Sequence, residues 1–449
     1  MDLNQKKVLV FGSGISGIGA SKLLVEIGAE VILYDGATTR TEEEIIEQLA
    51  MDIVEVVIGD LSEEKMKQLD LVVLSPGVPT DLPVVEKMRA LEIPIWGEVE
   101  LAYQFGKGDV LAITGTNGKT TTTALLGMIM KVYREETYIV GNIGNPYTEV
   151  ALDMTERSIV VAEMSSFQLE TIDTFAPQVS AILNITPDHL NRHHTMEAYI
   201  EAKKSIAINQ TKNQICVLNY EDEVTREFGK NVNAQVLYFS SQRKLDKGVY
   251  LVGDEIVCDI HEKEVLCNIH ELRILGKHNF ENVMAAAAMA ISYGVPHNLV
   301  RKVVLEFVGV EHRIEFVCEK HGVRYYNDSK GTNPDAAIKG IQAMNRPTIL
   351  IGGGYNKDST YEEWIQSFDG KVKMLILTGQ TRFMIQEAAM KCGFTNIMLI
   401  ESFEEAVEKS AQIAKQGDAV LLSPACASWG VFRNYEERGD KFKELVKNL

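Results

Sequence analysis

The chain has 449 residues, enough for about three domains of ordinary size. Its residues are 45% hydrophobic and 24% charged, a composition typical of a globular protein with sizeable cores. The formal net charge of −18 argues against a protein that binds nucleic acid or an anionic membrane surface, because both are negatively charged.

The sequence shows no sign of export or membrane insertion. Its apolar runs, such as residues 283–291, are far shorter than the ~20 residues that a spanning helix needs. The polar first residues lead into a predicted strand, so no signal peptide is expected. The cysteines lie far apart without a CxxC pair, which is typical of reduced thiols in a cytosolic protein. They are Cys216, Cys258, Cys267, Cys318, Cys392 and Cys426. We expect a soluble, cytoplasmic, multidomain protein.

Short β-branched runs alternate with helical patterns along the chain, which indicates α/β units around parallel sheets. The first set of predicted strands covers residues 7–11, 31–34, 71–74 and 93–96. The second covers 110–114, 138–140, 159–162, 179–183 and 215–218, and an alternating segment at 247–268 predicts antiparallel hairpins added to it. The third covers 323–326, 348–351, 374–377, 397–400 and 419–422. Each set is expected to form one sheet, with domains at 1–98, 99–309 and 310–449.

A glycine-rich turn follows the first predicted strand. It reads Gly12-Ser-Gly14-Ile-Ser-Gly17, and Asp35 stands at the end of the next strand. Glycines allow backbone N–H groups at a helix N-terminus to approach a phosphate, and this spacing is the fingerprint of NAD binding. A purely structural turn is the alternative. We expect a nucleotide or a diphosphate here, but the motif does not say which one.

A second phosphate loop follows the strand at 110–114. It reads Gly115-Thr-Asn-Gly118-Lys119-Thr120-Thr121, with Ile113 where the full Walker pattern has its first glycine. Its glycines expose amides to phosphate oxygens, Lys119 supplies charge at the β/γ positions, and the Thr120 hydroxyl can ligate Mg²⁺. A strand, this loop and a helix together predict an ATP site.

Polar residues end two further strands of the second set. Glu163 follows one strand and is a candidate Mg²⁺ ligand, although an ordinary strand-end glutamate is the alternative. The segment Asn184-Ile-Thr-Pro-Asp188-His189 follows another. His189 and His193 are four residues apart but lack the HExxH pattern, so a packing or orienting role is expected rather than zinc binding.

Two nucleotide-type loops in consecutive α/β domains fit neither a dehydrogenase nor a simple kinase. They fit an ATP-consuming ligase that holds a nucleotide-linked substrate in one domain and ATP in the next. At this point the whole chain resembles the Mur ligases of peptidoglycan synthesis, and within them the branch that adds D-glutamate.

Two groups of motifs carry this resemblance. Family-wide signals are residues 115–121, Glu163, Asp188-His189, the segment Gly276-Lys-His278-Asn279-Phe-Glu-Asn282, and Glu311-His-Arg313. More selective ones are Leu74-Ser-Pro-Gly77-Val-Pro, Ser165-Ser-Phe-Gln-Leu, Asn327-Asp328-Ser-Lys330 and Ser423-Pro-Ala-Cys-Ala-Ser428. One departure is Gly331, where the family pattern often carries alanine.

The resemblance implies a three-domain α/β fold, with a Rossmann-like N-terminal domain, a P-loop-type central domain and a Rossmann-like C-terminal domain. It implies that UDP-N-acetylmuramoyl-L-alanine is joined to D-glutamate, with ATP cleaved to ADP and phosphate through an acyl phosphate. The implied cofactors are ATP and Mg²⁺ at two sites. Both substrates are small molecules; no nucleic acid or membrane partner is expected, and we expect a monomer.

The resemblance also implies roles for individual residues. The UDP substrate would contact Gly14, Ile15, Ser16, Asp35, Ser75, Pro76, Gly77, Asn142 and His189. ATP would contact Gly115, Thr116, Asn117, Gly118, Lys119, Thr120, Thr121, Asn279, Asn282, Arg313 and Asp328. D-Glutamate would contact Thr332, Lys357, Ser428 and the backbone near Tyr435. The catalytic set would be Lys119, Glu163, His189, Lys203 and Lys330, and the metal ligands would be Thr120, Glu163, His189 and Lys203.

Lys203 stands out because the family carries a lysine carbamate, formed with CO₂, at the matching position. By its own pattern Lys203 is a helical surface lysine. Lys204 points about 100° away on the same helix, so only one of the two can face the site. We expect that residue to be Lys203.

Three alternatives stay open on the sequence alone. Another Mur enzyme or a folylpolyglutamate synthase would keep the chemistry, although the latter lacks a UDP domain ahead of the phosphate loop. A redox or sensor protein would use the turn at 12–17 and Asp35 for NAD. A non-catalytic interaction protein would leave the phosphate loop and Glu163 unexplained.

Overall fold

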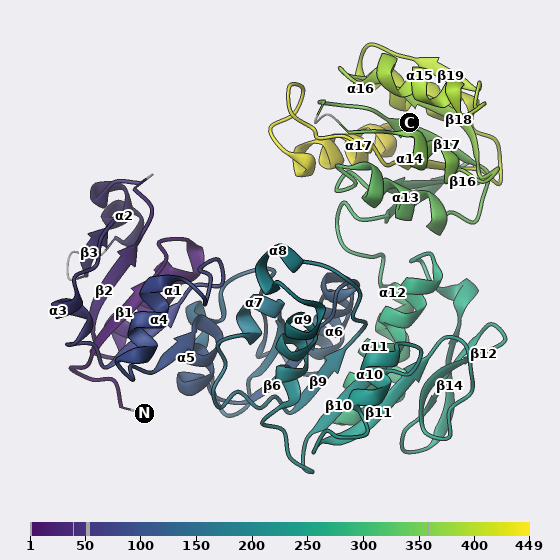
Figure 1. The fold of residues 1–449 in the computed structure, drawn as a ribbon. Coiled ribbons are helices and arrows are strands. Elements are labelled where there is room, and N and C mark those ends of the chain that lie inside the picture. The colour runs from purple at the N-terminus through teal and green to yellow at the C-terminus, as the bar shows by residue number, and fades with distance from the viewer. Residues whose placement is uncertain (1, 39, 51–53, 357–358) are drawn as a thin grey trace. The chain divides into compact units, whose positions relative to one another are not determined.

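The computed structural model describes residues 2–38, 40–50, 54–356 and 359–449. Within these ranges the chain forms three sheets, one from each predicted set of strands (Figure 1). It divides into two compact units, one of Met1–Leu266 with Glu281–Val303 and one of Cys267–Phe280 with Val304–Leu449.

The first sheet has the strand order β3-β2-β1-β4-β5, and its neighbouring strands are parallel. Its strands are β1 (Lys7–Phe11), β2 (Glu30–Asp35), β3 (Glu55–Ile58), β4 (Leu71–Leu74) and β5 (Ile95–Gly97). The connecting helices are α1 (Ile15–Glu26), α2 (Glu42–Leu49), α3 (Glu63–Met66) and α4 (Pro83–Ala90), and α5 (Glu98–Phe105) follows β5. The sequence predicted the last strand at residues 93–96, and the structure confirms a strand there but places β5 at Ile95–Gly97. It begins two residues later than predicted, because Pro94 has no N–H for the ladder.

The second sheet has the order β14-β13-β12-β11-β10-β9-β6-β8-β7. Its strands are β6 (Asp109–Thr114), β7 (Thr137–Gly141), β8 (Ile159–Glu163), β9 (Val179–Ile182), β10 (Ile215–Asn219), β11 (Gln235–Ser240), β12 (Gly248–Val252), β13 (Glu255–Asp259) and β14 (Lys263–Asn268). Its helices include α6 (Lys119–Tyr133), α7 (Ser166–Leu169), α8 (Leu190–His193), α9 (Met196–Lys204), α10 (Glu223–Phe228), α11 (Lys277–Tyr293) and α12 (His297–Glu306). β12 and β13 pair antiparallel, which confirms the predicted hairpin addition.

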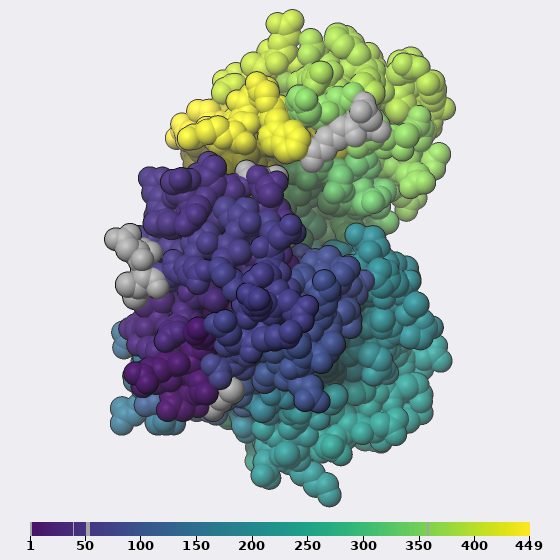
Figure 2. Space-filling view, turned by 60° about the vertical axis from the view of Figure 1, so that its left-hand side comes forward, coloured from purple at the N-terminus to yellow at the C-terminus, as the bar shows by residue number. Residues whose placement is uncertain are grey.

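The third sheet has the order β15-β16-β20-β17-β18-β19, and β15 and β16 pair antiparallel. Its strands are β15 (Glu315–Lys320), β16 (Val323–Asn327), β17 (Thr348–Gly352), β18 (Val372–Leu377), β19 (Ile397–Leu399) and β20 (Ala419–Leu422). Its helices are α13 (Pro334–Ala343), α14 (Glu362–Gln366), α15 (Arg382–Lys391), α16 (Phe403–Ile413) and α17 (Tyr435–Asn448). α17 packs against β15 and β16, and its yellow surface adjoins the green surface of the same unit in Figure 2.

The sheets are buried on both faces, which explains why most strands could be predicted from the sequence. In β1, Val8 and Val10 pack into one core and Leu9 and Phe11 into another. A parallel sheet covered on both sides needs such continuous apolar runs rather than alternation. These findings confirm the predicted three-sheet α/β architecture.

The cysteines and the helices can be compared with the expectations of reduced thiols and of no membrane-spanning segment. The structure describes all six cysteines, and each is a free thiol. No helix within the described ranges is long and apolar enough to cross a membrane.

Candidate active site

The glycine-rich turn between β1 and α1 is shaped by close backbone contacts. A Cβ at Gly17 would lie 1.8 Å from the Gly12 carbonyl oxygen, and Gly12 itself has φ +105°. Gly14 precedes α1 and faces open space, since a Cβ there would meet nothing within 4 Å. The N–H groups of Ile15 and Ser16 therefore begin a helix whose first turn carries no acidic side chain, an arrangement suited to an anion.

Asp35 organises this turn from the end of β2. Its Oδ2 accepts the Ser13 N–H at 3.0 Å and the Ser13 hydroxyl at 2.5 Å, and its Oδ1 accepts the Ala37 N–H at 3.0 Å. Burial acts to raise the pKa of Asp35, but these hydrogen bonds and Arg40 outweigh it and hold the pKa below its ordinary value. The carboxylate is thus ionised and bound to the loop itself.

The loop after β4 lies beside the same turn. The Ser75 N–H donates to the Phe11 carbonyl at 2.9 Å, and its hydroxyl donates to the Gly12 carbonyl at 3.3 Å. Pro76 and Gly77 follow, and a Cβ at Gly77 would meet open space. The structure therefore brings together the residues predicted to hold the UDP substrate in the first sheet.

The phosphate loop between β6 and α6 is closed by glycines and by its own lysine. Gly115 and Gly118 have φ +151° and +88°, conformations that side-chain-bearing residues rarely adopt. The Lys119 ammonium donates to the carbonyls of Gly115 and Thr116 at 2.9 and 3.0 Å. The half-buried Thr120 and the buried Thr121 follow in the first turn of α6.

Two asparagines brace this loop. Asn184 accepts the Asn117 N–H at 2.8 Å and donates to the Asn117 carbonyl at 3.0 Å. Asn282, on α11, comes so close that a Cβ at Gly118 would lie 2.3 Å from its Oδ1. The sequence predicted Asn282 as a nucleotide contact but assigned no role to Asn184 in the loop. Asn279 donates its side-chain N–H to the Leu275 carbonyl at 2.7 Å.

Glu163 ends β8 with an incompletely satisfied carboxylate. β8 pairs with β6 so that Glu163 stands opposite Ile113, next to the start of the phosphate loop. Its side chain is 1% exposed, and Oε1 accepts the Asn142 side-chain N–H at 2.8 Å. Oε2 has no hydrogen-bond partner among the residues that the structure describes. A buried carboxylate oxygen without a donor is costly, and a cation can satisfy it.

Lys203 is buried although it lies on a short polar helix. It is 2% exposed, and its ammonium donates to the Gly115 carbonyl at 2.9 Å and lies 4.7 Å from the Tyr199 ring centroid. Burial and the nearby Lys119 lower the pKa of Lys203 to about 7. Lys204 points elsewhere and pairs with Glu201 at 2.9 Å, as the helical geometry predicted.

The two histidines of the following segment differ in environment. His189 has φ +52°, is half-exposed, and lies 4.9 Å from the Phe167 ring centroid. His193 is buried and bonds to Ser166 and Glu170 at 2.9 and 3.1 Å. Among the described residues, no group of three or more His, Cys, Asp or Glu side chains gathers as a metal site. Mg²⁺ commonly uses one or two carboxylates plus substrate phosphates, so Glu163 with Thr120 fits it without such a cluster.

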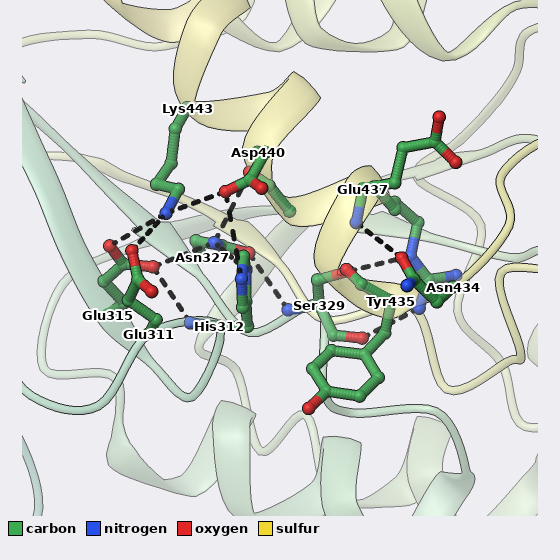
Figure 3. Close-up of polar contacts among 12 residues, drawn as sticks. Glu311, His312, Glu315, Asn327, Ser329, Asn434, Tyr435, Glu437, Asp440 and Lys443 are labelled. Carbon is green, nitrogen blue, oxygen red and sulfur yellow. Dashed lines mark hydrogen bonds and ion pairs between the residues drawn. The ribbon is translucent and has the colours of Figure 1, made fainter. Parts of the chain in front are cut away.

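In the second unit, the segment from Glu311 to Glu315 is held by Asn327 at the end of β16 (Figure 3). The Asn327 side-chain amide lies 3.0 Å from both Glu315 Oε2 and His312 Nδ1. His312 and Ile314 have φ +62° and +47°, so the exposed Arg313 stands between two left-handed residues. Lys443 on α17 adds ion pairs to Glu311, Glu315 and Asp440 at 2.9, 3.6 and 3.0 Å.

Asp328 is buried beside this segment. Its oxygens accept the Ser423 hydroxyl at 2.7 Å and the Ile314 N–H at 3.2 Å. Burial, opposed by these hydrogen bonds, raises the pKa of Asp328 to about 7. A Cβ at Gly331 would lie 2.8 Å from its Oδ2, so the glycine that departs from the family pattern packs tightly on this carboxyl group. A ribose contact by Asp328 stays a prediction.

Of the four residues predicted for D-glutamate, three lie within the described part of the second unit, and Tyr435 is the first residue of α17. The Tyr435 carbonyl accepts the Ser329 hydroxyl at 2.8 Å, and the Lys330 ammonium lies 5.5 Å from the Tyr435 ring centroid. Ser428 is buried, and the Thr332 N–H donates to the Lys330 carbonyl at 2.8 Å. Lys357 falls outside the described residues.

Arg438 is the residue of this region that sequence reasoning missed. It is 3% exposed and donates to the Ser329 hydroxyl, the Ser329 carbonyl and the Cys426 carbonyl at 2.9, 2.8 and 3.1 Å. It thus joins the Asn327–Lys330 segment to the Ser423–Ser428 segment. The sequence did offer one indication, because Arg438 follows Tyr435 by three residues and residues three apart are neighbours on one face of a helix.

Comparisons with known proteins agree with this architecture. The chain matches the models "Mur ligase MurD-like, N-terminal domain" at residues 6–97, "Mur ligase middle domain" at 113–290, and "Mur ligase, glutamate ligase domain" at 312–426. It is 56% identical to the UDP-N-acetylmuramoylalanine--D-glutamate ligase of Lachnoclostridium phytofermentans, over 100% of this chain and 99% of that one. It is 53% identical to the protein of the same name from Lachnospira eligens, over the whole of both chains.

A solved structure extends the likeness to the fold. The UDP-N-acetylmuramate-alanine ligase MurC of Thermotoga maritima aligns over 99% of both chains with a TM-score of 0.58 and 19% identity. The matched models and the full-length identities confirm the resemblance found in the motifs: this chain belongs to the Mur ligase family.

Proposed function

We propose that this chain joins D-glutamate to UDP-N-acetylmuramoyl-L-alanine in peptidoglycan precursor synthesis, with ATP cleaved to ADP and phosphate. The observation that carries the proposal is the buried Glu163 carboxylate, one oxygen of which has no hydrogen-bond partner in the part of the chain that the structure describes. It lies beside a phosphate loop whose carbonyls accept from Lys119. The names of the relatives that match the whole chain support the choice of substrates.

The chemistry has two steps. An oxygen of the substrate carboxylate attacks the γ-phosphorus, the bond to ADP breaks, and an acyl phosphate forms. The unprotonated amine of D-glutamate then attacks the acyl carbon, phosphate leaves, and the amine loses a proton. Negative charge gathers in both steps, so cations beside the transferred group are the main requirement.

The described residues can meet this requirement in stated roles. Lys119 would release its loop carbonyls to bind the β/γ-phosphates, and Lys330 would steady the transferred phosphoryl group. Thr120 and Glu163 would hold the Mg²⁺ of ATP, which supplies charge neutralisation when bound. Asn142 and His189 would orient the substrate carboxylate and a second Mg²⁺.

Lys203 would complete that second metal site as a carbamate. A pKa of about 7 leaves a substantial neutral fraction at neutral pH, and only the neutral amine attacks CO₂. The amine nitrogen bonds to the carbon of CO₂ and releases one proton to water, which leaves a carbamate anion. This anion can ligate a metal, and its formation removes the repulsion with Lys119. Incubation with ¹³C-bicarbonate should give a carbamate ¹³C resonance that Lys203→Arg abolishes and the matched control Lys204→Arg keeps. A signal unchanged in Lys203→Arg would refute this assignment.

The remaining assignments are proposed from the family pattern. The UDP part would contact Gly14, Ile15, Ser16, Asp35, Ser75, Pro76 and Gly77. ATP would contact residues 115–121, Asn279, Asn282, Arg313 and Asp328, and D-glutamate would contact Thr332, Lys357, Ser428 and Tyr435. We further propose domain boundaries at 98 and 309 and a monomeric, cytoplasmic enzyme.

The deciding experiment measures phosphate release from MgATP with UDP-N-acetylmuramoyl-L-alanine and D-glutamate, L-glutamate or no amino acid. Release that needs both the UDP substrate and D-glutamate is expected. Release with a different amino acid would keep the mechanism and change the substrate. No release, together with NADH binding in a fluorescence titration, would favour the NAD alternative. Against that alternative, the Asp35 carboxylate already accepts hydrogen bonds from Ser13 in the glycine turn.

A further inference from the structure

Arg192 on α8 connects three segments that are distant in the sequence. Its side chain is 12% exposed, and Nη2 donates to the Val78 carbonyl at 2.9 Å and to Glu170 Oε2 at 2.7 Å. The guanidinium carbon lies 5.0 Å from the Phe167 ring centroid. One cation therefore holds the loop after β4, the end of α7 and α8 together.

Each of these segments carries residues with a proposed role. Val78 closes a turn in which its N–H donates to the Ser75 carbonyl at 2.9 Å. This bond holds the shape of the turn at residues 75–78, so the bond from Arg192 to the Val78 carbonyl fixes where the turn lies rather than its shape. This turn lies beside the glycine turn, since a Cβ at Gly12 would come 3.2 Å from a Val78 methyl group. It would hold the nucleotide end of the substrate.

The other end of the connection leads to His189. The Phe167 ring has contacts with both Arg192 and the imidazole of His189, the latter at 4.9 Å between ring centroids. The backbone N–H of Arg192 also donates to the His189 carbonyl at 2.9 Å. Glu170, which accepts from Arg192, binds His193 at 3.1 Å with its other oxygen. His189 would orient the reacting end of the same substrate.

We propose that Arg192 is a positioning residue that sets the spacing between the nucleotide-binding turn at 75–78 and the reacting centre at His189. The inference rests on the proposed function, because both ends of the spacing belong to sites proposed above. A substrate that is held at its nucleotide end and reacts at its distant carboxylate depends on this spacing, whereas UDP alone does not.

Physical reasons favour arginine at this position. The planar guanidinium can donate to a carbonyl and a carboxylate within its plane while its flat face stacks on an aromatic ring, a geometry that a tetrahedral ammonium group does not reproduce. A charge-assisted bond of 2.7 Å in a mostly buried setting is stronger than a surface ion pair. A second link between the segments, from His194 to Asp81 at 2.9 Å, lies on the exposed surface and contributes little.

The test compares Arg192→Ala and Arg192→Lys with the matched control Arg226→Ala. Arg226 also donates to a backbone carbonyl, that of Tyr220 at 2.9 Å, and lies over an aromatic ring, but on α10, a helix that carries none of the proposed site residues. In Arg192→Ala we expect kcat/KM for UDP-N-acetylmuramoyl-L-alanine to fall by about 10–100-fold, because a misplacement of about 1 Å has that effect. Calorimetric affinities for UDP and for ATP should stay within about twofold.

Arg192→Lys should recover part of the loss, and Arg226→Ala should retain wild-type kcat/KM. The inference is overturned if Arg192→Ala keeps kcat/KM within about threefold of wild type. It is also overturned if UDP affinity falls as much as kcat/KM does, because the nucleotide site itself would then have collapsed. Should Arg192→Ala fail to fold, Glu170→Leu, which removes the acceptor of the Arg192 hydrogen bond and keeps most of the side-chain volume, takes its place with the same expectations. A wild-type chain that neither binds UDP nor releases phosphate would instead refute the proposed function.

Discussion

Replacing Arg438 tests how the second unit holds two segments of its proposed site. Arg438→Ala removes donors from two buried carbonyl oxygens, those of Ser329 and Cys426, and from the Ser329 hydroxyl. Each buried acceptor left without a donor costs ~1–3 kcal/mol, and the emptied volume adds to this. The desolvation cost of the guanidinium, which lowers the pKa of Arg438 to about 10, is regained and offsets part of the loss. We expect the free energy of unfolding to fall by about 3–5 kcal/mol.

Urea unfolding followed by tryptophan emission can measure this change. With Trp96 replaced by phenylalanine, the emission comes from Trp364 and Trp429, which both lie in the second unit. The unfolding midpoint should fall by about 2 M urea, taking an m-value of about 2 kcal/mol per M. Phosphate release should fall as well, because Ser329 stands between Asp328 and Lys330.

Two further variants decide whether the hydrogen bonds are responsible. Arg438→Met keeps most of the side-chain volume, so it should recover only the part of the loss that is due to packing. Arg433→Ala is the matched control, because the Arg433 side chain is 88% exposed and its ion pair with Glu437 is 3.4 Å long. We expect this variant to change the free energy of unfolding by no more than about 0.5 kcal/mol. A Met variant as stable as wild type would refute the reasoning, because the three hydrogen bonds would then contribute nothing net.

Three further outcomes follow from the geometry. Gly118→Ala should weaken ATP binding by about tenfold or more in calorimetry, because the new Cβ would lie 2.3 Å from Asn282 Oδ1 and the residue has φ +88°. The control is Gly294→Ala, which also has a positive φ but whose Cβ would face open space, and it should leave ATP binding unchanged. Burial raises the pKa of Glu98 from 4.5 to about 7, so its stabilising contribution is complete below pH 4.5 and is lost as the pH rises to about 7. In urea unfolding the wild type should therefore lose about 3 kcal/mol over this pH range, and Glu98→Gln should not. An equal pH dependence of the unfolding free energy in both proteins would contradict this. Glu163→Gln should lower kcat for phosphate release by about 100-fold or more and raise the Mg²⁺ concentration needed for half-maximal rate, and an unchanged Mg²⁺ requirement would remove Glu163 from the metal site.

Local pattern was enough to predict the sheets and the phosphate loop. Strands buried on both faces are continuous apolar runs, and a strand–loop–helix motif is contained in about a dozen neighbouring residues. The strands missed were β3, β11 and β15. β3 and β15 are edge strands, whose half-exposed residues give a weak pattern because one side of each ladder is open.

Local sequence pattern was sufficient to predict most of the strands, the glycines that shape the phosphate loop, and the family that the motifs resemble. The environment of the charged side chains depends instead on contacts between segments that are distant in the sequence. Helical periodicity separated Lys203 from Lys204, yet packing against Gly115 and Tyr199 is what buries Lys203 and lowers its pKa. Arg192 meets Val78 across 114 positions of sequence, and Arg438 meets Ser329 across 109. The burial and pKa of a charged group depend on such distant neighbours, and a local pattern carries no information about them.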